Sequence, residues 1–96
     1  MTALFVIELS VKDPDALKEY GSQTPPLLEK FGGTLLMKGK PELVFETNAG
    51  DVKYGMLVIF QFPTKEQAEG WYACDEYQAL IPVRDKAMDC TFRILA

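Results

Sequence analysis

Two short segments of the chain, residues 3–11 (ALFVIELSV) and residues 54–62 (YGMLVIFQF), are apolar on both faces of an extended strand. Successive side chains of a strand point to opposite faces of its sheet, so a strand that is apolar at both sets of positions must be covered on both sides. We therefore expect both segments to be buried strands at the centre of one sheet.

A first helix is predicted between residue 13 and the glycine pair at 32–33. Residues 13–15 (DPD) combine a capping carboxylate, a proline at the first helical position and an acid in the first turn. Residues 24–26 (TPP) interrupt the helix, because proline has no N–H to donate and restricts the residue before it. The sequence thus predicts a kink, or a restart capped by Thr24, and a helix end at the glycines.

A second helical region follows the second doubly apolar segment. Thr64 and Gln67 have the spacing of a capping box and predict a helix that begins at Lys65. Asp75, with a glutamine three residues later, predicts that the helix restarts there. Pro82 is expected to divide the remaining residues into a short turn and a helix of about two turns.

Three further segments are predicted to be extended. Residues 34–40 (TLLMKGK) are expected to form an edge strand, with a bulge or bend at Gly39 before the strand resumes at 42–46. Residues 48–51 (NAGD) have the composition of a turn and complete a hairpin with the second doubly apolar segment. Residues 90–95 (CTFRIL) form the last predicted strand.

The predicted order is strand, helix, strand, strand, helix, strand. This order is typical of an α+β, ferredoxin-like βαββαβ fold, an antiparallel sheet with both helices on one face. The first and third strands of that fold lie in the centre, which agrees with their doubly apolar pattern. A length of 96 residues favours a single domain over residues 1–96.

Two helices cover only one face of such a sheet, and the opposite face is predicted to be apolar as well. Leu4 and Val6 face that side, and Leu57 and Ile59 are expected to join them. A patch of this kind is unfavourable in a monomer. We therefore expect a homodimer that packs sheet face against sheet face about a two-fold axis, a dimeric α/β-barrel.

The composition argues against several classes of partner. With 14 acidic and 10 basic residues the chain has a net charge of -4, so no nucleic acid is expected. Histidine is absent, and we predict neither a metal site nor a cofactor. The longest apolar run, residues 56–60, is too short to span a membrane. We expect a cytoplasmic protein in which Cys74 and Cys90 remain reduced.

Residues 62–84 concentrate large amphipathic side chains, including the single tryptophan. Aromatic walls with one planar guanidinium suit a small, partly apolar molecule that carries a carboxylate or an enolate. The candidate small-molecule-binding residues are Tyr20, Trp71, Tyr72, Tyr77 and Arg84.

The same residues also have a purely structural interpretation. Trp71 and Tyr72 lie at helical spacing typical of core positions. Arg84 would then pair with a carboxylate such as Glu76, or with one on a partner chain, because a desolvated guanidinium requires a counter-charge. Tyr77 fits either interpretation, since a buried phenol needs a hydrogen-bond partner of some kind.

No catalytic residue is assigned from the sequence. Glu8 and Glu46 lie on predicted strands and could act as bases only if they were buried, whereas most strand glutamates face water. Cys74 precedes Asp75 and Glu76, whose charges favour an ordinary thiol. The lysines in or beside the hairpin are interpreted as a solvated edge that discourages strand addition: Lys38, Lys40 and Lys53.

An ordered set of short motifs from residue 31 to residue 84 resembles the family catalogued as domain of unknown function 1330. The set comprises Phe31-Gly32-Gly33, Lys38-Gly39, Phe62-Pro63-Thr64, Glu66, Ala68, Trp71-Tyr72, Glu76-Tyr77, Leu80 and Arg84. The chain departs from the usual pattern at Thr47 and at Cys74-Asp75. The resemblance implies membership of the dimeric α/β-barrel superfamily, whose relatives include cofactor-independent monooxygenases and muconolactone isomerase.

Two functional hypotheses follow from these observations. The first is a cofactor-independent enzyme, of the isomerase or monooxygenase type, that acts on a small aromatic or unsaturated acid. The second is a non-catalytic dimeric module that binds a small molecule or stabilises a partner. The absence of histidine favours the second, and the superfamily resemblance favours the first.

Overall fold

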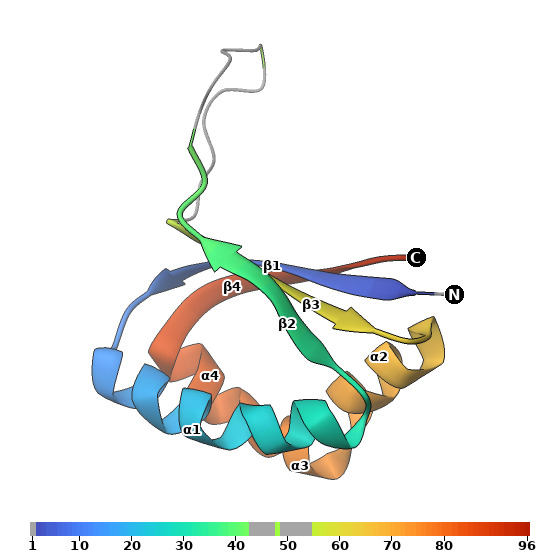
Figure 1. Ribbon diagram of the computed structural model, residues 1–96. Helices are drawn as coiled ribbons and strands as arrows, with labels where there is room; N and C mark the ends of the chain where they lie inside the picture. The colour runs from blue at the N-terminus through green and yellow to red at the C-terminus, as the bar shows by residue number, and fades with distance from the viewer. Residues whose placement is uncertain (1, 43–47, 49–54) are drawn as a thin grey trace.

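A computed structural model describes residues 2–42, 48 and 55–96 of the chain (Figure 1). Its elements are β1 (Ala3–Val11), α1 (Pro14–Lys30), β2 (Thr34–Gly39), β3 (Met56–Phe62), α2 (Lys65–Ala73), α3 (Asp75–Gln78), α4 (Ile81–Ala87) and β4 (Met88–Leu95). None of these helices is long and apolar enough to cross a membrane. The predicted strand at 42–46 and turn at 48–51 fall outside the described residues, apart from Glu42 and Asn48.

The four strands form one antiparallel sheet in the order β2-β3-β1-β4. The two doubly apolar segments, β1 and β3, are therefore the central strands, as predicted, and β2 lies at an edge. All the helices lie on one side of the sheet (Figure 1). The α+β, ferredoxin-like arrangement expected from the sequence is confirmed.

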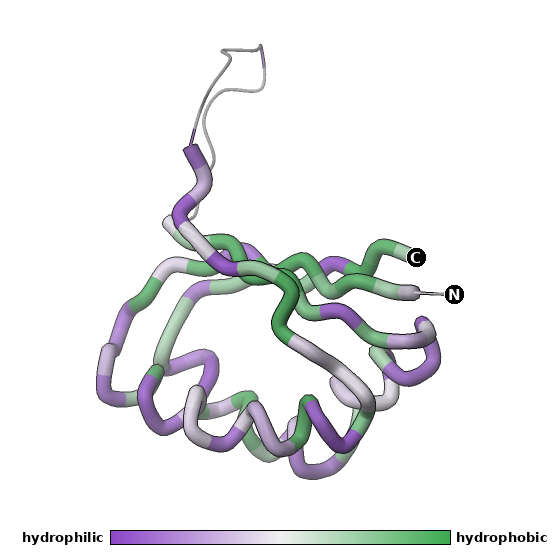
Figure 2. Tube along the Cα trace, in the orientation of Figure 1, coloured by the Kyte–Doolittle hydropathy of each residue, from purple (hydrophilic) through white to green (hydrophobic). Residues whose placement is uncertain are grey.

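The two sets of alternating positions on β1 face different environments. Phe5, Ile7 and Leu9 are buried beneath the helices, whereas Leu4 and Val6 are only half-buried. The strand register places a set of partly exposed apolar residues on the side away from the helices, which we call the open face: Leu4, Val6, Met37, Leu57, Ile59 and Leu95. The strands consist predominantly of hydrophobic residues, whereas hydrophilic and hydrophobic residues alternate along the helices (Figure 2).

Helix α1 runs without a break through Pro25 and Pro26, so the predicted restart with Thr24 as a second cap is wrong. The two prolines leave the carbonyls of Gly21 and Ser22 without their helical N–H donors. Gly21, Ser22 and both prolines are exposed, so water can take the place of the missing donors. The N-terminus is capped as predicted, because Asp13 accepts hydrogen bonds from the N–H groups of the first turn.

Thr64 caps α2 as predicted, and its hydroxyl accepts a hydrogen bond from the Gln67 N–H. The cap of α3 differs from the prediction, because Cys74 and not Asp75 occupies that position. The Cys74 sulfur accepts from the Tyr77 N–H at 3.4 Å and donates to the Trp71 carbonyl at 3.1 Å. The thiol thus joins the end of α2 to the start of α3.

β2 contains a bulge that the sequence did not predict, because its register with β3 shifts between Leu35 and Met37. The predicted bulge or bend between Gly39 and Glu42 leads into a strand that lies outside the described residues. The shift places Met37 opposite Ile59 on the open face, while Leu35 stays opposite Phe60 beneath the helices. The side chains of Leu35, Leu36 and Met37 are exposed because β2 lies at the edge of the sheet.

Candidate functional site

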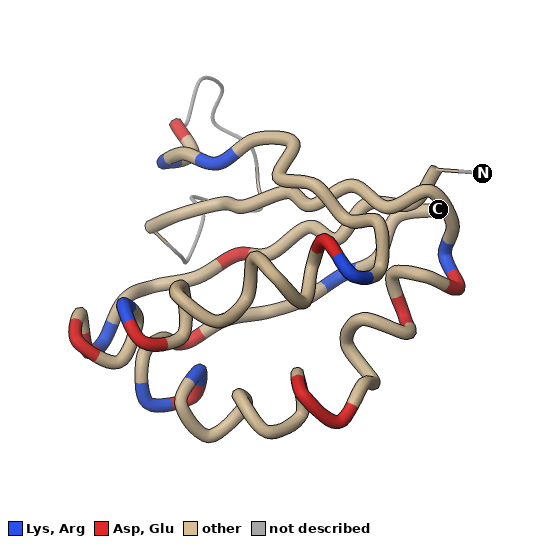
Figure 3. Tube along the Cα trace, turned by 60° about the horizontal axis from the view of Figure 1, so that its bottom comes forward, with Lys and Arg blue, Asp and Glu red and all other residues tan. Residues whose placement is uncertain are grey.

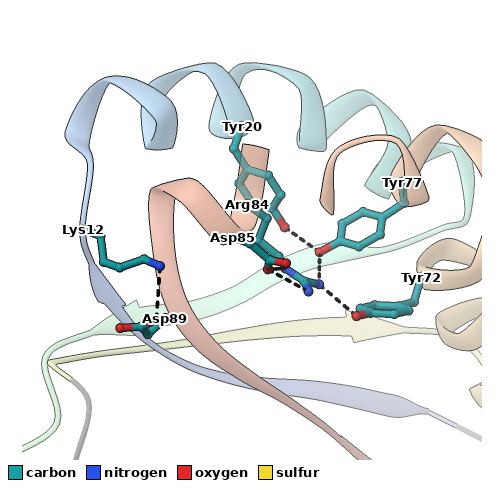
Figure 4. A network of polar contacts seen from close by, with 7 residues as sticks. All are labelled: Lys12, Tyr20, Tyr72, Tyr77, Arg84, Asp85 and Asp89. Atoms are coloured by element: carbon teal, nitrogen blue, oxygen red, sulfur yellow. Dashed lines mark hydrogen bonds and ion pairs between the residues drawn. The ribbon is translucent and has the colours of Figure 1, made fainter. Parts of the chain in front are cut away.

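A polar network centred on Arg84 connects α1, α2, α3 and α4 (Figure 4). One terminal NH2 group of the guanidinium donates to the Tyr72 hydroxyl at 2.9 Å and to the Tyr77 hydroxyl at 3.4 Å. The Tyr77 hydroxyl also lies 2.7 Å from that of Tyr20. Four of the five predicted site residues therefore form one hydrogen-bonded chain.

The counter-charge of Arg84 is Asp85, at 3.2 Å from the guanidinium, and not Glu76. Glu76 pairs instead with Lys30 at 2.9 Å on the surface. Acidic and basic residues are interspersed along the helices of the described chain (Figure 3). Arg84 therefore pairs with a carboxylate, as the structural interpretation predicted, but with Asp85 and not with Glu76, which pairs with Lys30 of α1.

The Arg84 side chain is only 11% exposed and is held between aromatic rings. Its guanidinium carbon lies 5.2 Å from the centre of the Phe92 ring and 5.7 Å from that of Tyr72, within the range of cation–π attraction. Burial disfavours the charge, but hydrogen bonds to Tyr72 and Tyr77 outweigh it and raise the pKa of Arg84. The guanidinium is thus a fixed, permanently charged donor.

The phenols of Tyr20 and Tyr77 are held in their neutral form. Burial, with a smaller contribution from the neighbouring Tyr77, raises the pKa of Tyr20 above its ordinary value. Burial also raises the pKa of Tyr77, although hydrogen bonds with Tyr20 and Arg84 oppose the increase. Both hydroxyls therefore retain a proton that they can donate at neutral pH.

Trp71 and Tyr77 lie in the core and are 0% exposed. The centre of the Trp71 ring lies 4.6 Å from the centre of the Tyr77 ring. It lies between 5.6 and 5.7 Å from the ring centres of Phe5, Phe60 and Phe62. Its indole N–H has no hydrogen-bond partner among the described residues. Trp71 thus lies at the centre of an aromatic cluster.

A pocket of about 340 Å³ lies between α1 and the sheet, and we call it the α1 pocket. It is lined by Ile7, Leu9, Leu17, Tyr20, Gly21, Leu35, Lys38, Met56, Val58, Phe60, Met88 and Phe92. Of the five candidates from the sequence, Tyr20 alone is among these lining residues. Lys38 is the one charged residue of this lining in the described part of the chain.

Tyr72 lies on a different surface, a groove beside β4 lined by Phe5, Glu69, Tyr72, Ala73, Phe92 and Ile94. Phe92 borders both this groove and the α1 pocket. The predicted site residues thus divide into three environments. Tyr20 lines the α1 pocket, Tyr72 lines the groove, and Trp71, Tyr77 and Arg84 line neither of them.

Sequence reasoning missed Gly21, Lys38, Phe60 and Phe92 as pocket residues. Gly21 carried a signal, because a glycine inside a helix costs stability and implies some other requirement at that position. A Cβ atom built at Gly21 would meet no atom within 4 Å. Lys38 is exposed on the edge strand as expected, but it also borders the pocket.

The weaker catalytic candidates have structural roles where they are described. Glu8 lies on the side of the sheet away from the helices, paired with Arg93 at 3.3 Å. Cys74 is the helix cap described above. Glu46 lies outside the described residues.

The strand order and the helix layer define the class of protein, an α+β domain with a ferredoxin-like fold. The model of a family described as Domain of unknown function (DUF1330) matches residues 2–96. The chain belongs to this family, as its motifs predicted. A comparison with curated proteins found no match.

Solved structures of similar fold have low sequence identity to this chain. The RPA0582 protein of unknown function from Rhodopseudomonas palustris is 19% identical with a TM-score of 0.76, over 98% of this chain and 80% of that one. SnoaB, a cofactor-independent oxygenase from Streptomyces nogalater, is 11% identical with a TM-score of 0.65, over 99% and 91%. A dimeric ferredoxin-like protein of unknown function from Thermobifida fusca is 12% identical with a TM-score of 0.56, over 100% and 91%.

Proposed function

We propose that this protein is a homodimer that binds a small aromatic or unsaturated molecule in the α1 pocket. The observation that carries the proposal is the pocket itself, about 340 Å³ of space between α1 and the sheet. Its walls are apolar side chains from α1 and all four strands, with Tyr20 as a hydroxyl-bearing residue and Lys38 as a cation. A mostly apolar pocket with a few polar groups is typical of small-molecule sites.

Lys38 favours an acidic ligand over a neutral one. The sequence suggested Arg84 as the group that meets a carboxylate, but Arg84 is engaged with Asp85 and two phenols and does not line the pocket. Lys38 does line it. A carboxylate at the pocket mouth would thus meet an ammonium group, while the rings of the ligand pack against Phe60 and Phe92.

Catalysis on the same molecule is the second candidate function. It is supported by the similarity of fold to SnoaB, itself a cofactor-independent oxygenase, and that support is analogy of fold. Tyr20 would then polarise an oxygen atom of the substrate, because its phenol remains neutral and can donate. Conversion of a bound aromatic acid without any added cofactor would favour the enzyme over the binding module.

The dimer is proposed to form through the open face. Met37 and Leu95 on this face are 68% and 63% exposed, and half-buried Val6 and Ile59 lie between their strands. Burial of apolar area of this kind is worth roughly 25 cal/mol per Å², which favours association of two copies. The dimeric relative from Thermobifida fusca has the same fold and supports this assembly.

Sedimentation of the protein and of two matched variants tests the dimer. Val6→Glu places a charge in the open face and is expected to give monomers. Val11→Glu adds the same charge to the exposed end of the same strand and is expected to leave the dimer intact. A wild-type protein that sediments as a stable monomer at micromolar concentration would rule out the dimer.

Ligand binding is tested with 2-naphthoate, an aromatic acid with two fused rings, by isothermal titration calorimetry. Gly21→Phe is expected to abolish binding, because its ring would occupy the open space beside Gly21. Gly21→Ala adds a single methyl group and is expected to bind almost as the wild type does. Equal binding to the wild type and to Gly21→Phe would show that the α1 pocket is not the site.

A further inference from the structure

The direction of the hydrogen bonds around Tyr77 bears on what the α1 pocket recognises. A guanidinium can only donate, so the Tyr77 oxygen accepts the 3.4 Å bond from Arg84. The 2.7 Å contact between Tyr77 and Tyr20 contains one more hydrogen, which either hydroxyl could supply. The question is which of the two phenols donates.

The charge on Arg84 favours Tyr77 as that donor. A hydroxyl that accepts a hydrogen bond from a cation becomes polarised, and its own hydrogen becomes a stronger donor. Tyr77 is therefore the better donor and Tyr20 the acceptor in their short contact. In this arrangement the hydrogen of the Tyr20 hydroxyl is not used between the two phenols.

The Tyr20 hydrogen then needs another acceptor. Within the described part of the chain, the Tyr20 hydroxyl has no hydrogen-bond partner besides Tyr77. Tyr20 lines the α1 pocket, where its neighbours are apolar side chains such as Leu17 and Phe92. A buried donor without an acceptor is unfavourable by roughly 1–3 kcal/mol, so an acceptor on a ligand would be stabilising.

We infer that Tyr20 is a ligand-binding residue that donates its hydroxyl hydrogen to an oxygen atom of the molecule in the α1 pocket, and that Arg84 and Tyr77 are positioning residues that orient this hydrogen. The inference rests on the proposed function and specifies its ligand. The ligand class is an aromatic or conjugated molecule with a carbonyl or carboxylate oxygen set among its apolar atoms. An unsubstituted hydrocarbon would fill the pocket without meeting the donor.

The neutral state of Tyr20 agrees with the role of a donor. Burial raises the pKa of the phenol, so a phenolate does not form at physiological pH. A neutral phenol can donate its hydrogen to an acceptor oxygen of a ligand. The site would therefore distinguish a ketone from the hydrocarbon of the same ring system.

The test compares two probes of similar shape, naphthalene and 1-acetonaphthone, by equilibrium dialysis. The wild type is expected to bind the ketone more tightly than the hydrocarbon. Tyr20→Phe should lower the affinity for the ketone by about three- to tenfold, the usual net value of one hydrogen bond. Its affinity for naphthalene should change by less than about twofold, which also shows that the variant folds.

Tyr72→Phe is the matched control. It removes a phenol oxygen that accepts from Arg84 at 2.9 Å but belongs to the groove beside β4 and not to the α1 pocket. The ratio of ketone to naphthalene affinity should stay at its wild-type value. An equal fall in this ratio in Tyr72→Phe and Tyr20→Phe would overturn the assignment of Tyr20 as the donor.

The positioning role of Tyr77 is tested by combining variants. Tyr77→Phe should lower the ratio of ketone to naphthalene affinity in the wild type but should not lower it further in Tyr20→Phe. The carbonyl stretch of the bound ketone should also move to higher frequency in both single variants. A similar effect of Tyr77→Phe in both backgrounds would contradict orientation through Tyr20.

The outcomes separate this inference from the proposed function. If naphthalene binds but the ketone gains nothing over it, the donor role of Tyr20 is wrong while the α1 pocket remains a binding site. If neither probe binds, both the proposed function and this inference are wrong. A ketone preference that Tyr20→Phe removes supports both.

Discussion

Two parts of the layer between the helices and the sheet, the aromatic cluster around Trp71 and the α1 pocket, differ in how completely they are filled. Beneath α2 and α3, Trp71, Tyr77 and Phe62 are 0% exposed and pack ring against ring. Beneath α1, the same sheet borders a pocket of about 340 Å³. The strands supply apolar side chains to both parts, and the helix residues that face them differ. α2 contributes a tryptophan, whereas α1 contributes Gly21.

Gly33 and Gly21 show the same difference in packing at single positions. A Cβ atom at Gly33 would lie 2.6 Å from the ring of Phe62 and 2.7 Å from Leu28, closer than packed atoms allow. A Cβ atom at Gly21 would meet nothing within 4 Å. Gly33 is thus required by close packing, whereas Gly21 borders open space.

The largest expected effect is the loss of the aromatic centre in the filled part. Trp71→Ala should lower the free energy of unfolding by about 3–5 kcal/mol, because it removes a fully buried indole and leaves a cavity. Chemical denaturation measures this change. Leu17→Ala, at the wall of the α1 pocket, is the comparison, and it should cost clearly less. Equal losses would contradict the difference between the two parts.

A smaller effect is expected from overpacking at Gly33. Gly33→Ala should be destabilising by about 1–3 kcal/mol, because the new methyl group forces the Phe62 ring or the Leu28 side chain to move. The midpoint of thermal unfolding measures the effect. A Gly33→Ala protein as stable as the wild type would show that the filled part has unused space.

Alkaline pH tests the two phenols at the boundary between the two parts. Burial raises the pKa of Tyr20 and of Tyr77, so both keep their protons in the folded state at a pH where the unfolded chain releases them. Their contribution to stability is complete below the unfolded pKa of about 10. Above it, stability should fall with rising pH, by up to about 1.4 kcal/mol per pH unit for each phenol, until that phenol also ionises in the folded state.

Denaturation at several pH values above 10 measures this dependence, with Tyr20→Phe as the comparison. The variant should show a shallower decline, because it has one fewer tyrosine with a raised pKa. Identical slopes for the two proteins would mean that Tyr20 titrates normally and is not desolvated.

The smallest expected effect lies at the α1 pocket. Gly21→Ala should raise the free energy of unfolding by roughly 0.5–1 kcal/mol, because alanine favours a helix over glycine and the methyl group meets no atom. Thermal unfolding of the variant measures this gain. A destabilised Gly21→Ala would indicate that the space beside α1 is closed in solution.

The arrangement of the fold could be predicted from the sequence because it depends on local patterns. The doubly apolar segments identified the central strands β1 and β3, and Thr64 identified the start of α2. The continuity of α1 through Pro25 and Pro26 could not be predicted. It depends on water reaching the carbonyls that the prolines leave without donors, and so on the exposure of that turn.

The candidate site was less predictable than the fold. The sequence identified the tyrosines and Arg84, and the structure joins four of these residues in one network. It could not identify Asp85 in place of Glu76 as the partner of Arg84, because that choice depends on the reach of Lys30 from another helix. A pocket is space left by many side chains together, and no single residue type signals it.

A crystal structure of the wild-type protein with 1-acetonaphthone tests the central claim most directly. We expect the ketone in the α1 pocket, with its oxygen within hydrogen-bonding distance of the Tyr20 hydroxyl and its rings against Phe60 and Phe92. A ketone bound elsewhere, or a pocket closed by the surrounding side chains, would contradict it.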